Sequence, residues 1–115
     1  MEMNANQKDV GKNLEVFQAS FCLAAELFRK TKQFPIEVFS SLTNPIMQSA
    51  TKTAGRILEW CETGTARFLK EAQNHQKRLA KFLEKAQSGG YLKEKETEGF
   101  KEQIESIKKE IKKLY

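Results

Sequence analysis

Hydrophobic residues along this chain recur at intervals of three and four, the spacing that places side chains on one face of an α-helix. The first such segment starts near Leu14. It must end near Gln33, because the residue before Pro35 is pushed out of the α conformation. Asp9 or Asn13 is expected to cap its start. The face predicted to point inward comprises Leu14, Phe17, Phe21, Ala24 and Phe28.

Two prolines mark the next boundaries. Pro35 suits the first position of a short helix, where no amide donor is needed. Pro45 ends that segment, because inside a helix its ring would clash with the preceding turn. A second long helix is expected from Asn44-Pro45 to about Glu62. Its predicted inward residues are Ile46, Ala50, Thr53, Ile57, Trp60 and Cys61.

Glycines delimit the remaining helices. Gly64 predicts a stop before a third helix over residues 66–87, and Ser88-Gly89-Gly90 predicts the stop after it. A continuous helix through Gly64 is the alternative, since glycine costs only about 1 kcal/mol inside a helix. The third helix is predicted to bury Phe68, Ala72, Leu79, Phe82, Leu83 and Ala86. The last helix, over residues 93–114, carries a coiled-coil-like seam of Phe100, Ile104, Ile107, Ile111 and Leu114.

These elements predict an all-α fold, an antiparallel up-down four-helix bundle. The alternative has the second and third helices fused into one long helix. Residues 1–10 are expected to form a flexible polar tail, and residues 11–115 a single four-helix-bundle domain. The longest apolar run, Phe21 to Ala25, is far shorter than the roughly 20 residues of a membrane span. No signal-peptide core follows Met1, so we expect a cytoplasmic protein.

The residues suited to catalysis are few and scattered. His75 is the only histidine, and no motif places a serine, cysteine or aspartate beside it, so a packing or interface role is expected. Cys22 and Cys61 are expected to be buried small residues, because two cysteines make neither a disulfide framework nor a metal cluster. The glycines are turn formers and build no phosphate cradle. We therefore expect no enzymatic activity, no cofactor and no metal.

The excess of positive charge is concentrated on the third helix. The chain carries a net charge of +5, and the third helix holds six basic residues against two acidic ones. At about 100° per residue, the six fall within roughly a quarter to a third of the helix circumference, nearly opposite the apolar side. They are Arg67, Lys70, Lys77, Arg78, Lys81 and Lys85. This face is the predicted nucleic-acid-binding site, because an unbroken basic face attracts phosphates. The alternative is a solvated face that only maintains solubility.

The first helix has a second apolar ridge beside its main face. Val16, Leu23 and Leu27 form it. A helix in an isolated bundle usually needs one apolar stripe. The second ridge is therefore predicted to contact a neighbouring subunit, although a single wide stripe on a central helix would give the same pattern.

Part of the chain also resembles a known bacterial family. The matching residues are Leu14-Glu15-Val16, Gln18, Glu26, Arg29, Thr31-Lys32, Phe34-Pro35, Glu37, Leu42-Thr43, Gly90-Tyr91-Leu92, the Glu-rich opening of the last helix and Ile111-Lys112-Lys113-Leu114. They resemble a family of four-helix-bundle proteins first known from intervening sequences of ribosomal RNA genes. That family is related to the accessory variability determinants of diversity-generating retroelements. The chain departs from the pattern at Met47-Gln48, where the family usually has an arginine pair.

The resemblance implies a ring-like homopentamer and a nucleic-acid enzyme, such as a reverse transcriptase, as partner. Together with the charge pattern, it predicts a homo-oligomeric accessory protein whose basic surface binds RNA or DNA. Two alternatives remain: a protein-docking scaffold without nucleic-acid affinity, and an amphipathic helical coat on an apolar surface. The coat would be favoured by fused second and third helices.

Overall fold

Four long helices make up most of the chain. The computed structural model describes residues 5–114, and the side chains from residue 11 onward except that of residue 12. The helices are α1 (Ala5–Thr31), α2 (Asn44–Thr63), α3 (Ala66–Ser88) and α4 (Glu94–Leu114). A 3-10 turn, η1 (Ile36–Val38), and a π-helical turn, η2 (Phe39–Thr43), lie between α1 and α2. No strand occurs in residues 5–114, so the predicted all-α class with four helices is confirmed.

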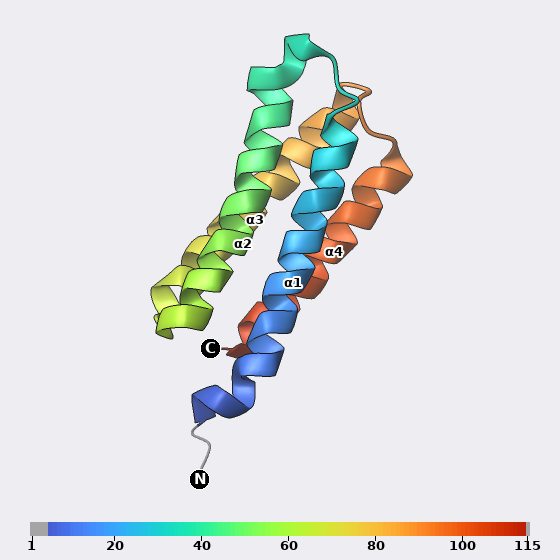
Figure 1. Ribbon diagram of the computed structural model, residues 1–115. Helices are drawn as coiled ribbons and strands as arrows, with labels where there is room; N and C mark the ends of the chain where they lie inside the picture. Colours follow the sequence, from blue (N-terminus) through green and yellow to red (C-terminus); the bar gives the residue numbers. More distant parts are fainter. Residues whose placement is uncertain (1–4, 115) are drawn as a thin grey trace.

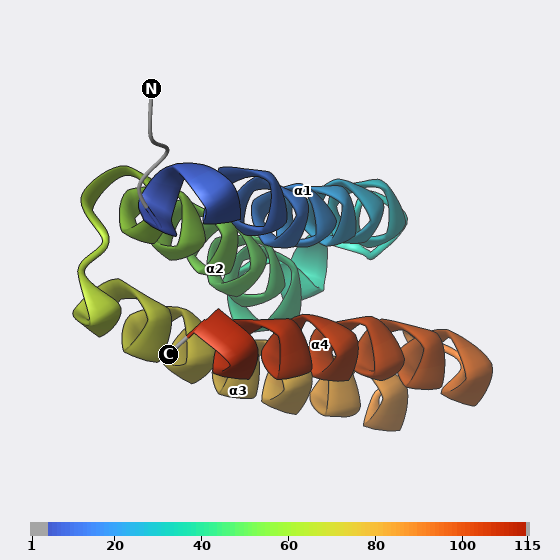
Figure 2. The ribbon, with the colours of Figure 1, turned by 90° about the horizontal axis from the view of Figure 1, so that it is seen from below.

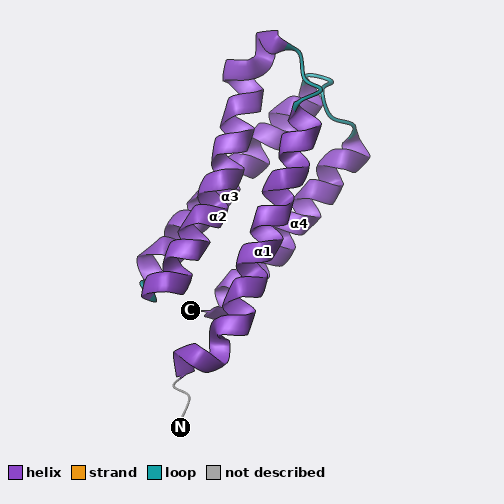
Figure 3. Ribbon diagram, viewed as in Figure 1, coloured by secondary structure: helices purple, strands orange, loops and turns teal. Residues whose placement is uncertain are grey.

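The helices lie side by side in an elongated molecule of 56 × 24 × 20 Å. In Figure 1 the ribbon rises in α1, descends in α2, rises in α3 and descends in α4. Figure 2 shows α1 and α2 lying over α3 and α4. Helix α1 packs against α2 and α4, and α3 packs against the same two helices, so α1 and α3 lie diagonally across the bundle. The connections are confined to the helix ends (Figure 3).

The predicted breaks between helices coincide with those of the structure. Gly64 has a left-handed φ of 71°, and its N–H donates to the carbonyl of Trp60 at 2.7 Å. This geometry closes α2 and turns the chain within two residues, so the alternative of a fused second and third helix is wrong. Pro45 lies in the first turn of α2, as predicted. The short segment after Pro35 consists of 3-10 and π-helical turns.

The start of α1 differs from the prediction. The helix begins at Ala5, so residues 5–10 are helical and the predicted tail boundary at residue 10 is misplaced. Residues 1–4 of that tail lie outside the described part. Asp9 and Asn13, the predicted caps, are both inside the helix. The polar composition of this end led to a late predicted start, because an apolar pattern appears only from Leu14 onward.

The core is formed by apolar residues from all four helices. The buried apolar residues of α2, α3 and α4 lie on the faces that were predicted to point inward. The buried residues include Ile46, Ala50 and Ile57 from α2, Ala72, Leu79 and Leu83 from α3, and Ile104, Ile107 and Ile111 from α4. The aromatic residues Trp60, Phe68, Phe82 and Phe100, also predicted to point inward, are only partly buried. Of these four, Trp60, Phe82 and Phe100 pack against the edge of the core.

Helix α1 is rotated by about a third of a turn from the predicted orientation. Of its predicted inward residues, Phe17 and Ala24 are partly buried against the core. Val16, Leu23 and Leu27, predicted to contact a neighbouring subunit, are buried in the core of the single chain. They cannot form a contact surface between subunits. Leu14, Phe21 and Phe28, predicted to point inward, are exposed. The buried ridge also contains Ser20 and Thr31. These polar residues interrupt its apolar pattern, and the unbroken but exposed ridge therefore gave the stronger helical signal.

Candidate nucleic-acid interface

The six predicted basic residues of α3 all lie on the surface. Arg67, Lys70, Lys77, Arg78, Lys81 and Lys85 are exposed. The opposite side of the helix is buried through residues such as Leu69, Leu79 and Leu83. The structure therefore places these cations together on the outward side of α3, and we call them the basic face. Its exposure follows from the helical period, because the core residues fix which side of α3 points outward.

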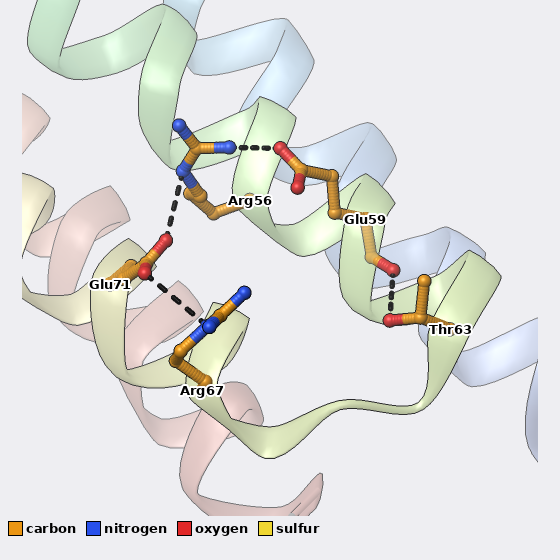
Figure 4. Close-up of polar contacts among 5 residues, drawn as sticks. All are labelled: Arg56, Glu59, Thr63, Arg67 and Glu71. Atoms are coloured by element: carbon orange, nitrogen blue, oxygen red, sulfur yellow. Dashed lines mark hydrogen bonds and ion pairs between the residues drawn. The ribbon is translucent and has the colours of Figure 1, made fainter.

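The two acidic residues of α3 lie at the edges of the basic face and are paired with other helices. Glu71 forms one ion pair with Arg56 of α2 at 3.1 Å and another with Arg67 at 3.7 Å (Figure 4). Glu84 pairs with Lys101 of α4 at 2.6 Å. Arg56 also contacts Glu59, one turn further along α2. These carboxylates are thus occupied by cations of neighbouring elements.

Five of the six cations have no ion-pair partner among the described residues. The sixth, Arg67, pairs with Glu71, and its guanidinium also lies 5.1 Å from the ring of Phe68. The other five make no ion pair with any residue that the structure describes: Lys70, Lys77, Arg78, Lys81 and Lys85. The uncompensated part of the basic face therefore extends from Lys70, near the start of α3, to Lys85, near its end.

A sixth free cation joins this face from α2. Lys52 is exposed and, with Arg78 and His75, lines a groove between α2 and α3. Among the described residues Lys52 pairs with no carboxylate. Sequence reasoning missed Lys52, because a periodicity along α3 carries no information about which side of α2 packs beside it. Only the packed pair of helices brings the two charges together.

His75 lies half-buried in this groove, consistent with the expected packing role. Its pKa is lowered, first by burial and then by the positive charges of Lys52, Arg78 and Arg56, with Glu71 acting in the opposite direction. The neutral imidazole is therefore favoured near neutral pH.

Exposed apolar side chains gather on another face. Leu14, Phe21 and Phe28 of α1 are followed by Ile36 and Phe39. We call these five residues the α1 apolar strip. Along α1 it extends about 21 Å, given a rise of about 1.5 Å per residue. Its far end borders a hollow of about 390 Å³, whose lining includes Phe28, Ile36, Phe39, Phe34 and Met47.

A hollow of larger volume lies elsewhere on the molecule. It has a volume of about 580 Å³ and lies between the N-terminal half of α1, the α2–α3 turn and the end of α4. Its lining includes Trp60, Leu69 and Ile107, together with Glu110 and Lys113, which pair with each other at 3.2 Å. Glu15 also lines this hollow and forms no ion pair with a described residue, so the hollow carries no excess positive charge. The basic face is therefore the stronger candidate for binding a polyanion.

Neither cysteine fits the expectation of a buried residue. Cys22 is exposed, which makes that prediction wrong, and Cys61 is half-buried. Burial raises the pKa of the Cys61 thiol, whose Sγ donates to the carbonyl of Asn13 at 3.5 Å. Within the described residues, no three histidine, cysteine, aspartate or glutamate side chains are grouped so that they could hold a metal ion. No described helix is long and apolar enough to cross a membrane.

Comparison of the chain with models of protein families, with curated proteins and with solved structures finds no match. The resemblance to the intervening-sequence proteins therefore rests on the matching residues in the sequence alone.

Proposed function

We propose that this protein is a non-enzymatic accessory protein that binds RNA or DNA through the basic face of α3. The observation that carries the proposal is the set of five cations on one outward side, none paired with a described carboxylate. Both acidic residues of α3 are held at the edges by Arg56 and Lys101. Such a face attracts a polyanion, because neutralised phosphates release their condensed counterions.

The binding mode that this surface supports is independent of base sequence. Phe68 and Phe82, the aromatic residues beside the basic face, are only half exposed. Lys85 lies 5.1 Å from the ring of Phe82 and so covers part of it. Stacking on bases needs open aromatic surfaces. Contacts from lysine and arginine to backbone phosphates are therefore the expected mode, for RNA and DNA alike.

Self-assembly forms the second part of the proposal. The α1 apolar strip replaces the predicted ridge as the proposed contact between subunits, because exposed contiguous apolar patches mark interaction sites. Since α1 and α3 are diagonal, assembly through α1 would leave the basic face accessible on every subunit. We propose an antiparallel up-down bundle as the subunit. The resemblance implies a ring of five and a nucleic-acid enzyme, such as a reverse transcriptase, as partner.

The α1 apolar strip also favours one alternative function, a protein-docking scaffold without nucleic-acid affinity. It serves that role as well as it serves self-assembly. The third reading, a helical coat on an apolar surface, loses the support that a continuous α2–α3 rod would have given, because Gly64 separates the two helices.

Salt-dependent binding separates the two remaining functions. Fluorescence anisotropy with labelled mixed-sequence RNA is expected to show binding at about 50 mM salt that weakens by about 10-fold or more at about 200 mM. Reversing Arg78, Lys81 and Lys85 to glutamate should weaken binding at low salt by about 100-fold or more. A matched control reverses Lys95, Lys109 and Lys112, three exposed lysines of α4. Absence of binding at low salt would leave only the scaffold function.

A further inference from the structure

The groove between α2 and α3 collects positive charge from both helices. It has a volume of about 170 Å³. Lys52 and Arg78 are exposed at this groove, His75 is half-buried and Ser49 is buried. The remaining lining consists of Asn44, Pro45, Gln48 and Phe82, so no carboxylate belongs to the described lining. The groove therefore offers two cations, an imidazole and several neutral hydrogen-bonding groups.

The nearby acidic residue does not neutralise these cations. Among the described residues, Glu71 is the one acidic group whose charge favours protonation of His75, and it is held by Arg56 at 3.1 Å and by Arg67 at 3.7 Å. Arg56 in turn is shared between Glu71 and Glu59. The groove consequently keeps the charges of Lys52 and Arg78 without a described counterion.

We propose that this groove binds a tetrahedral oxyanion, with Lys52 and Arg78 as charge partners and His75 as a hydrogen-bond donor. The proposal rests on the proposed function and deepens it, because it names where one backbone phosphate of the nucleic acid is held. The volume corresponds to about six water molecules at about 30 Å³ each, which is enough for one phosphate group. Arginine presents a planar fork to such an anion and lysine a point charge, so the two provide complementary contacts.

Protonation of His75 is coupled to occupancy of the groove. In the free protein, burial and three cations, Lys52, Arg78 and Arg56, lower the pKa of His75 against the opposing effect of Glu71. An anion placed between them opposes the cations and favours the imidazolium. The pKa of His75 therefore rises when the anion binds. By reciprocity, the protonated protein binds the anion more tightly than the neutral one.

The single histidine makes this coupling directly measurable. The imidazole Cε1 proton of His75 is followed by NMR between about pH 5 and about pH 8, the range in which histidine titrates. Sodium sulfate is the probe, since it keeps its double charge in this range, and sodium chloride at equal ionic strength is the reference. Sulfate is expected to raise the pKa of His75 by about 0.5 or more, which equals about threefold tighter binding to the protonated form. Equal pKa values in sulfate and chloride would overturn the proposal.

Two variants and one control locate the effect. Lys52→Ala and Arg78→Ala should each raise the pKa of His75 in chloride, because a repelling cation is lost, and should shrink the sulfate-induced rise by more than half. Lys112→Ala removes an exposed lysine of α4 and should preserve the full rise. A rise that survives in both groove variants, or shrinks equally in the control, contradicts a site in this groove.

A second titration identifies the source of the anion. A single-stranded oligonucleotide without terminal phosphates, which carries only backbone diesters, should raise the pKa of His75 as sulfate does. A rise in sulfate but not with the oligonucleotide rejects the backbone phosphate as ligand. Salt-dependent RNA binding without any sulfate effect would reject the groove while leaving the proposed function intact. The two proposals can thus fail separately.

Discussion

Leu27 and Phe28 are neighbours in α1, yet Leu27 is 1% exposed in the bundle core and Phe28 is 43% exposed. Successive residues of a helix point about 100° apart, so the apolar arc of α1 continues beyond the part that the bundle covers. Phe21, one heptad before Phe28, is 60% exposed. The side chains of α1 therefore serve two different surfaces, one internal and one external.

The external surface predicts that assembly depends on the phenylalanines. In the proposed assembly, Phe21→Ser combined with Phe28→Ser should yield monomers while changing the unfolding free energy of the subunit by only about 0.5 kcal/mol per exposed site. Leu27→Ala should instead destabilise the subunit by about 2–5 kcal/mol, because it opens a cavity in the core. Light scattering gives the mass and urea unfolding the stability. An unchanged mass in the double phenylalanine variant would exclude this strip as the subunit contact.

The two ridges of α1 show which features of this fold can be predicted from the sequence and which cannot. The start of α2 at Pro45 and its end at Gly64 were predictable, because proline is favoured in the first turn of a helix and glycine adopts the left-handed conformation that ends one. The inward side of α4 was predictable as well, since Ile104, Ile107 and Ile111 have no competing ridge. In α1 two ridges compete, and only packing against α2 and α4 decides between them.

The candidate site likewise has one part that the sequence predicts and one part that it does not. The basic face lies within one helix and follows from its period. The groove needs Lys52 from α2 beside Arg78 and His75 from α3. The relative rotation of two packed helices depends on all their contacts and is not encoded in either helix alone.

Two glycines allow a matched test of the α2–α3 turn. Gly64 has a φ of 71°, where an added Cβ is strained, so Gly64→Ala should destabilise the protein by about 1–2 kcal/mol. Gly55 lies inside α2 with no atom within 4 Å of an added Cβ. Gly55→Ala should therefore stabilise by about 0.5–1 kcal/mol through helix propensity. Urea unfolding measures both, and a stabilising Gly64→Ala would argue against the left-handed turn.

A small hollow in the core contains polar atoms without partners. Ser20 and Gln76 both line it, and neither Oγ of Ser20 nor Oε1 of Gln76 has a hydrogen-bond partner among the described residues. Nε2 of Gln76 donates to the carbonyl of Ile104 at 3.3 Å. An unpaired buried hydroxyl costs about 1–3 kcal/mol, so Ser20→Ala should stabilise the protein by about 1 kcal/mol or more.

Helix propensity alone also favours alanine over serine, and a control removes that contribution. Ser106 is exposed on α4. Ser106→Ala should give only the propensity difference, about 0.5 kcal/mol. The gain from Ser20→Ala beyond this value measures the buried hydroxyl. A net loss of stability in Ser20→Ala would show that the hydroxyl is hydrogen-bonded in solution.

The lowered pKa of His75 predicts a pH dependence of stability with a definite sign. Burial and the charges of Lys52, Arg78 and Arg56 disfavour its protonated form in the folded chain, whereas an unfolded histidine titrates near about 6.5. The unfolded state therefore takes up more protons as the pH falls through that value, and the contribution of His75 to stability is lost on the acidic side. His75→Gln should flatten the decline in the urea midpoint between about pH 7.5 and about pH 5.5. Lys52→Ala should flatten it partly, because one of the repelling cations is removed. A decline of equal steepness in wild type and His75→Gln would assign the acid sensitivity to groups other than this histidine.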